Sequence, residues 1–282
     1  MPCIRKKIQL AGNIVELLIE APQVAAKAQA GHFVVVMADD RGERVPLTIA
    51  DSDPSQGTIT VVLAVVGTST RKLARLAEGD RLYALLGPLG HPSKVLSSGT
   101  VIMVAGGVGV APIYPIAKAL RQAGARVIAI QGSRTASLLF WQERLAMVSD
   151  RHLVVTDDGS AGRKGLVTEP LGELLQSSPE PIRCVYAIGP GPMMRACCET
   201  TRPCGVPTVV SLNTVMVDGT GMCGGCRVRV GGQTLFTCVD GPEFDGHQVD
   251  WDTVLSRQKI YLAEERASLA HWCSLDQYIP QT

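Results

Sequence analysis

The sequence lacks any uninterrupted apolar stretch long enough to cross a membrane. Its longest apolar run, residues 101–117, is broken by glycine and proline, which is typical of a buried strand followed by a turn. The first residues, MPCIRKKIQL, carry charge but not the apolar core of a secretory signal peptide. We therefore expect a cytoplasmic location and no membrane span.

An excess of charge of either sign is also missing. Lys and Arg together number 27 and Asp and Glu number 26, so the net charge is +1 and offers no strong field for nucleic acid or an anionic membrane. The five histidines form neither an H-E-x-x-H motif nor an i, i+4 pair, and we interpret them as structural or surface residues. The nine cysteines are odd in number, which argues against a disulfide framework.

What the sequence does contain is a dense group of sulfur, acid and glycine in one short stretch. Asp218, Cys223, Cys226 and Cys238 are separated by four, two and eleven residues. This is the plant-type spacing of [2Fe–2S] ligands, with aspartate in place of the first cysteine. Glycines in the same loop let backbone N–H groups turn toward a negatively charged cluster. The stretch predicts a [2Fe–2S] centre, which carries single electrons.

Other interpretations of the same residues stay open. A C-x2-C pair also occurs in zinc knuckles, although zinc ribbons usually contain a second such pair, and this sequence has none. The cysteines could also be buried free thiols. Asp218 could cap a turn instead of binding iron.

The pattern along the chain changes near residue 98. Short apolar runs separated by Gly, Asp and Ser predict an antiparallel β-barrel over residues 1–97. Strand and helix patterns then alternate over residues 98–209, including a helix expected over 138–149, which predicts an α/β doubly wound parallel sheet. Residues 210–250 hold the cysteine motif as a small loop module, and residues 251–282 form a C-terminal tail.

Four glycine-rich or polar turns follow the strands expected in the α/β region. In a doubly wound sheet the carboxyl ends of the strands meet at one crevice, where nucleotides bind. Glycines allow the chain to turn tightly there, so that helix N–H groups approach a pyrophosphate. The candidate nucleotide-binding residues are Gly106, Gly107, Gly109 and Pro112, then Ser133 and Arg134, then Asp157, and last Gly189, Pro190, Gly191 and Met193.

Three motifs lie in the expected barrel. RVPLT, residues 44–48, combines a cation, a proline-stiffened strand and a hydroxyl group. GTSTRKL, residues 67–73, places three hydroxyl groups at the start of a helix, which is a candidate phosphate site. GPLG, residues 87–90, is a tight turn.

Taken together, the order RVPLT, GTSTRKL, GPLG, AGGVGVAP, TDDGS, AIGPGPMM and D-x4-C-x2-C-x11-C resembles the ferredoxin–NADP reductase superfamily with a fused [2Fe–2S] loop. Within it, the chain resembles small subunits of electron-bifurcating NADH-dependent reduced ferredoxin:NADP oxidoreductases, also known as sulfide dehydrogenase subunits. It also resembles the electron-transfer subunits of dihydroorotate dehydrogenase, which have a cysteine where Asp218 stands.

This resemblance implies an FAD in the barrel, NAD(H) or NADP(H) in the α/β domain, and a larger flavin or iron–sulfur partner subunit. It places Thr48 near flavin N5, Leu47 on the ring and Gly87 in the flavin site, and it places Thr68, Ser69 and Thr70 at the FAD phosphates. Arg44 stands one residue earlier than the arginine of the superfamily pattern, so its contact with the pyrophosphate stays open.

The resulting interpretation is a chain that passes electrons between NAD(H), FAD and a [2Fe–2S] cluster, to or from a partner subunit. The cofactors carry this chemistry, so no catalytic acid or base is expected. Alternatives are the electron-transfer subunit of dihydroorotate dehydrogenase, a stand-alone NAD(P)H-dependent sulfide, polysulfide or ferredoxin reductase, and a non-catalytic zinc-bearing interaction module.

Overall fold

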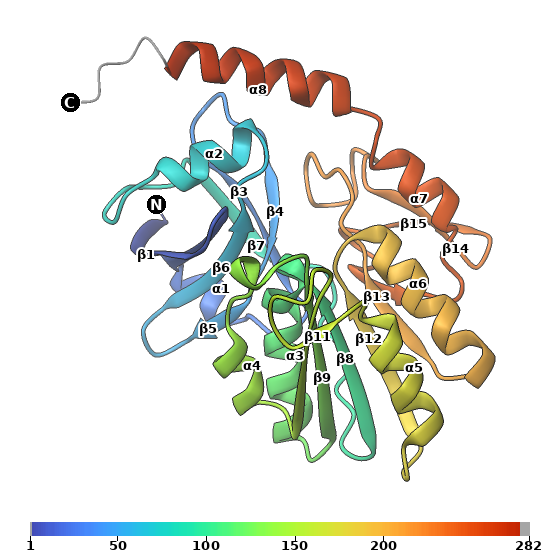
Figure 1. The fold of residues 1–282 in the computed structure, drawn as a ribbon. Coiled ribbons are helices and arrows are strands. Elements are labelled where there is room, and N and C mark those ends of the chain that lie inside the picture. The colour runs from blue at the N-terminus through green and yellow to red at the C-terminus, as the bar shows by residue number, and fades with distance from the viewer. Residues whose placement is uncertain (1, 277–282) are drawn as a thin grey trace.

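The computed structural model describes residues 2–276 and contains two β-rich layers joined to a helix-covered sheet (Figure 1). No helix within the described residues is both long and apolar enough to cross a membrane. The N-terminal part folds into two antiparallel sheets with the strand orders β1-β2-β6-β5 and β4-β3-β7. Its elements are β1 (Cys3–Ala11), β2 (Ile14–Glu20), α1 (Pro22–Ala25), β3 (Phe33–Met37), β4 (Val45–Thr48), β5 (Asp51–Asp53), β6 (Thr58–Ala64), α2 (Thr68–Arg75) and β7 (Ala84–Leu89).

Alternation of apolar side chains builds the core of this β-barrel domain. Ile4, Leu17, Val34 and Ile59 point inward from four strands and are almost fully buried in one cluster. The β-branched and aliphatic residues of these strands therefore form one core between the two sheets, as the sequence pattern predicts.

The second part is a seven-stranded sheet with the order β11-β10-β9-β8-β12-β13-β16. All of its strand pairs are parallel except β13 with β16. Its strands are β8 (Thr100–Gly106), β9 (Arg126–Ser133), β10 (Arg151–Thr156), β11 (Arg163–Lys164), β12 (Ile182–Ile188), β13 (Thr208–Ser211) and β16 (Glu243–Asp245). Its helices are η1 (Gly107–Gly109), α3 (Val110–Gln122), η2 (Ala136–Leu138), α4 (Gln142–Met147), α5 (Thr168–Ser177), α6 (Gly191–Thr201) and η3 (Arg202–Cys204).

Helices cover both faces of this sheet, as expected for a doubly wound fold (Figure 1). One core packs α3 and α4 on one face, and the other packs α5, α6 and α7 (Trp251–Arg257) on the opposite face. The strands read as continuous apolar runs because both faces are buried. The hairpin β14 (Arg227–Val230) and β15 (Gln233–Phe236) follows, and α8 (Leu262–Asp276) ends the described chain.

The helix expected over residues 138–149 is shorter in the structure, where α4 covers only Gln142–Met147. Trp141 adopts the left-handed conformation, with φ 54°, so α4 begins only at the residue after it. Its indole N–H donates to the buried carboxylate of Glu16 at 2.9 Å, and Arg144 lies 3.6 Å from the same carboxylate. This contact between the α/β domain and β2 outweighs the local helix preference.

Candidate iron–sulfur and nucleotide site

The hairpin β14–β15 brings two of the predicted iron ligands together. Cys226 precedes β14 and Cys238 follows β15, and the strands pair Arg227 with Phe236. The two sulfur atoms lie 3.2 Å apart without a disulfide, in side chains that are 1% and 3% exposed. Burial, and then the neighbouring Cys226 thiol, raises the pKa of Cys238 to about 12. Two unpaired thiols are therefore held side by side under the loop.

The other two predicted ligands lie at the surface of the same loop. Cys223 is exposed, and the carboxylate of Asp218 accepts N–H hydrogen bonds from Thr220 at 2.9 Å and from Cys223 at 2.7 Å. The Thr220 N–H first, and then that of Cys223, lowers the pKa of Asp218. The structure thus shows Asp218 as a turn cap, which was the alternative left open. Among residues 2–276, no three His, Cys, Asp or Glu side chains are grouped closely enough to hold a metal ion.

The loop backbone nevertheless has a shape suited to a cluster. Gly219 and Gly221 have φ angles of 78° and 88°, which other residues rarely adopt. A Cβ on Gly221 would lie 2.7 Å from Val239, and one on Gly219 would lie 3.0 Å from Val35. Soft thiolate ligands, two of them buried, and a glycine-lined loop fit an iron–sulfur cluster.

The buried cysteines pack directly on the β-barrel domain. Cys226 and Cys238 share an apolar cluster with Phe33 and Val35 of β3. Strand β3 pairs with β4, where Phe33 stands opposite Thr48. The expected flavin strand and the expected cluster ligands are therefore separated by one strand of packed side chains.

The barrel motifs surround this contact. Leu47 and Thr48 are half-buried in β4, and Leu47 packs partly against the barrel core. Gly87 lies in β7, where a Cβ would come 2.7 Å from Val34. The guanidinium of Arg44 donates to the carbonyl of Val217 at 3.3 Å, so in this structure Arg44 contacts the cysteine loop.

The three hydroxyl groups of the phosphate motif lie in the first turn of α2. Thr70 Oγ1 accepts from the N–H groups of Val66 and Gly67, each at 3.0 Å, and so closes the turn. The hydroxyl of Ser69 donates to the carboxylate of Glu43. Thr68 leaves its hydroxyl on the outer side of the turn, 2.9 Å from Ser268.

The glycine turns after β8 and β12 meet at the point where the strand order reverses. A Cβ on Gly106 would lie 2.3 Å from Met193 Sδ, and one on Gly109 would lie 2.0 Å from the carbonyl oxygen of Ile188. A Cβ on Gly189 would lie 3.0 Å from the backbone of Gly106. Only glycine permits this approach, and a crevice at such a reversal is where open α/β sheets bind ligands.

The remaining nucleotide candidates line the same edge of the sheet. The backbone N–H of Asp157, after β10, donates to the carbonyl of Ser133 at 3.1 Å, and Asp158 contacts the carbonyl of Arg134 in the same way. Gly107 lies in η1, and Pro112 lies in the first turn of α3. Pro190 and Gly191 begin α6. The structure therefore gathers all four predicted turns along one edge.

One half-buried acid, hydrogen-bonded to a buried serine, escaped the sequence analysis. Glu243 of β16 accepts a hydrogen bond from the hydroxyl of Ser93 at 2.5 Å. Burial raises the pKa of this carboxyl to about 7, and the Ser93 hydrogen bond opposes that rise. The sequence around Glu243 gives no signal of this environment, because β16 has only three residues and its pairing with β13 joins segments distant along the chain.

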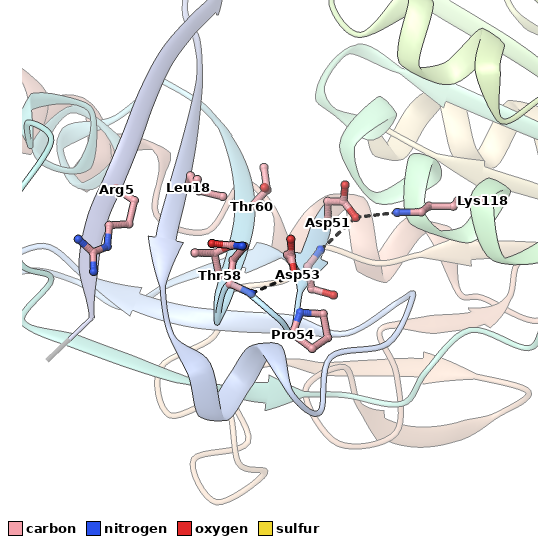
Figure 2. A pocket seen from close by; sticks show the side chains of 10 residues that line it. Arg5, Leu18, Asp51, Asp53, Pro54, Thr58, Thr60 and Lys118 are labelled. Carbon is pink, nitrogen blue, oxygen red and sulfur yellow. Dashed lines mark hydrogen bonds and ion pairs between the residues drawn. The ribbon is translucent and has the colours of Figure 1, made fainter.

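A hollow of about 680 Å³ lies elsewhere, on the outer face of the β1-β2-β6-β5 sheet (Figure 2). It is lined by polar side chains, and the ion pair between Asp51 and Lys118, at 3.1 Å, closes one end. Arg5 at the other end pairs with Glu20. None of the predicted site residues lines this hollow.

Comparison with protein-family models gives two matches. Residues 213–250 match the iron–sulfur cluster binding domain of dihydroorotate dehydrogenase B, and residues 103–199 match the oxidoreductase NAD-binding domain. The first range contains all four predicted iron ligands, and the second contains all four glycine or polar turns.

Whole-chain comparisons agree with these matches. The chain is 46% identical over 94% of its length to a dihydroorotate dehydrogenase B electron-transfer subunit homologue of Thermotoga maritima, covering 93% of that protein. It is 34% identical over 85% of its length to the electron-transfer subunit of Bacillus caldolyticus, covering 94% of it.

Among solved structures, an NADH-dependent reduced ferredoxin–NADP oxidoreductase, described in connection with flavin-based electron bifurcation, superposes with a TM-score of 0.91. It is 44% identical and covers 97% of this chain and 98% of its own. Phthalate dioxygenase reductase, 17% identical with a TM-score of 0.57, shares the fold over 82% of this chain and 86% of its own. The chain therefore belongs to the oxidoreductase family of dihydroorotate dehydrogenase B electron-transfer subunits and their homologues.

Proposed function

We propose that this chain passes electrons between NAD(H), FAD and a [2Fe–2S] cluster as one subunit of an electron-bifurcating ferredoxin:NADP oxidoreductase. The observation that carries the proposal is the packing of Cys226 and Cys238 against Phe33 and Val35 of β3. That contact joins the iron–sulfur loop to the strand beside Thr48 through side chains that are all buried.

Each part of the chain has a distinct task in this scheme. The turns after β8 and β12 bind the pyrophosphate of NAD(H), because their glycines bring backbone N–H groups close to the crevice. The β4 strand orients the flavin ring through Leu47 and Thr48, and the first turn of α2 binds its phosphates. FAD held by these residues would supply the conversion between the electron pair of one hydride and the single electrons that a [2Fe–2S] cluster carries. We assign FAD binding to residues 1–97, NAD(H) binding to residues 98–209 and the iron–sulfur cluster to residues 210–250. Residues 251–282 form a C-terminal extension.

The loop ligands fit a cluster held by Cys223, Cys226, Cys238 and Asp218. The buried pair Cys226 and Cys238 anchors it from below, and the exposed pair closes it from the solvent side. The exposed position of Cys223 also directs the cluster toward a partner subunit. Met222 beside it is 89% exposed, which suits a surface that another protein covers.

The structure described in connection with electron bifurcation is 44% identical to this chain, whereas the electron-transfer subunit of Bacillus caldolyticus is 34% identical, and this difference favours the bifurcating complex over dihydroorotate dehydrogenase as the parent assembly. All nine cysteines are free thiols, which supports a reducing, cytoplasmic location. Cell fractionation tests the location, and copurification from the native host identifies the larger subunit.

Cofactor analysis of the anaerobically purified chain tests the proposal. We expect one FAD and about two irons with two sulfides per chain. Stoichiometric zinc with no iron, or a colourless protein, would contradict it.

A further inference from the structure

The C-terminal helix α8 connects two distant parts of the molecule. The preceding helix α7 packs against α6 and β14, and Arg257 at its end donates to the carbonyl of Gly225 in the cysteine loop at 2.9 Å. Helix α8 then crosses to the β-barrel domain and lies over α2 (Figure 1). The chain thus returns from the iron–sulfur loop to the expected flavin phosphate site.

Contacts between α8 and α2 are few and polar. Ser268 Oγ lies 2.9 Å from Thr68 Oγ1, the hydroxyl on the outer side of the phosphate turn. One turn further on, the Trp272 ring lies 5.5 Å from Lys72 Nζ and 4.9 Å from Arg75 Cζ. These are cation–π distances, and both cations belong to α2.

Within residues 2–276, much of α8 lies at the surface. The residues from Tyr261 to Ser268 are all exposed, so the first half of the helix has almost no buried surface. The indole N–H of Trp272 is buried and has no hydrogen-bond partner within residues 2–276. A helix held mainly by one hydroxyl contact and one aromatic ring opens without disturbing either core.

We propose that α8 is a lid over the FAD phosphate site, latched by Trp272, and that its opening limits exchange of FAD. The inference rests on the proposed function, because it takes the first turn of α2 as the site of the FAD phosphates. Ser268 contacts the first of the three hydroxyl groups in that turn, and Trp272 contacts Lys72 and Arg75 in the last turn of the same helix.

Charge substitutions on α8 test this placement. If the helix lies beside the FAD phosphates, the rate of FAD release depends on the sign of a charge introduced on it. Ser268→Asp places a carboxylate next to Thr68 and is expected to speed FAD release, whereas Ser268→Lys slows it. The matched pair is Ser274→Asp and Ser274→Lys, on the same helix at an exposed position. The difference in FAD release rate between Ser268→Asp and Ser268→Lys is expected to shrink at high salt, because salt screens exposed charges.

The readout is the rate of FAD release, followed by the fluorescence of free FAD after dilution of the loaded full-length chain. Trp272→Ala is expected to raise this rate about ten-fold. Equal rates for Ser268→Asp and Ser268→Lys, or equal effects at position 274, would overturn the lid. A wild-type chain that binds no FAD at all would instead refute the proposed function.

Discussion

At the scale of single residues, the cysteine loop divides its four predicted ligands between two buried and two more accessible side chains. The hairpin places Cys226 and Cys238 side by side in the interior, whereas Cys223 is exposed and Asp218 is half-buried. We therefore expect cluster assembly to bring Cys223 and Asp218 toward the buried pair.

Cys223→Ser tests this division. The change removes a thiolate ligand without altering the buried pair, so iron content and the EPR signal of the reduced protein are expected to fall to near zero. Cys204→Ser is the matched control, because Cys204 is an exposed cysteine in η3 and does not belong to the predicted ligand motif. Wild-type iron in both variants would refute the ligand assignment.

Asp218 has two roles to separate, capping and ligation. Asp218→Asn keeps a side-chain oxygen for the N–H groups of Thr220 and Cys223, and Asp218→Cys supplies a thiolate instead. If Asp218 binds iron, the Cys variant keeps a cluster with a shifted midpoint potential and EPR spectrum, because sulfur donates more electron density than oxygen. Spectra identical to wild type in both variants would leave Asp218 as a cap alone.

Spacing along the chain was enough to predict these ligand candidates, because the loop is local. The residues behind them were not predictable. Phe33 and Val35 read as ordinary strand residues, and only the tertiary fold places them against Cys226 and Cys238. Glu243 was missed for the same reason, since its hydrogen-bond partner Ser93 lies 150 positions away along the chain.

At the scale of elements, the glycine turns are the most demanding feature of the α/β domain. Gly109→Ala would force a Cβ to 2.0 Å from the carbonyl oxygen of Ile188, so the turns after β8 and β12 must separate. We expect a loss of roughly 1–3 kcal/mol of stability and weaker NADH binding. Gly12→Ala is the control, because nothing lies within 4 Å of its Cβ. Equal melting temperatures and NADH affinities for the two variants would contradict the close approach.

Strand β16 carries a pH-dependent contact through Glu243. Burial raises its pKa from 4.5 to about 7, so between these values the folded state keeps a proton that the unfolded state releases. Stability from this group is complete below pH 4.5 and is lost as the pH rises through 7. The total is about 3.5 kcal/mol, at about 1.4 kcal/mol per pKa unit.

The side chain of Glu243→Gln stays neutral at every pH. We therefore expect its melting temperature, relative to that of the wild type, to increase as the pH rises from 5 to about 8. Exposed Glu199 pairs with Arg195, and Glu199→Gln serves as the control with no such trend. A constant difference between wild type and Glu243→Gln across this range would show that the carboxyl does not titrate there.

Strand and helix alternation predicted the doubly wound sheet, because buried parallel strands leave long apolar runs. It failed where contacts between domains decide the local structure. Trp141 leaves the expected helix to reach Glu16 of β2. The short antiparallel strand β16 has three residues and no periodic signal, and it is recognisable only beside β13.

At the scale of the whole molecule, polar contacts join the β-barrel domain to the rest of the chain at separate points. Glu16 binds Trp141, Asp51 binds Lys118 and Arg44 binds the cysteine loop (Figure 2 shows the second). These contacts hold the nucleotide crevice, the flavin strand and the buried cysteines in one arrangement. We therefore expect electrons to pass through the chain without rearrangement of its domains.

Anaerobic mixing of the loaded, isolated chain with NADH tests this central claim most directly, with flavin absorbance and rapid-freeze EPR followed in parallel. We predict that the flavin absorbance falls first and that the signal of the reduced [2Fe–2S] cluster appears after it, without any partner subunit. Cys223→Ser should keep the flavin phase and lose the EPR signal. A flavin that NADH leaves oxidised, or a cluster that stays oxidised beside a reduced flavin, would contradict the account.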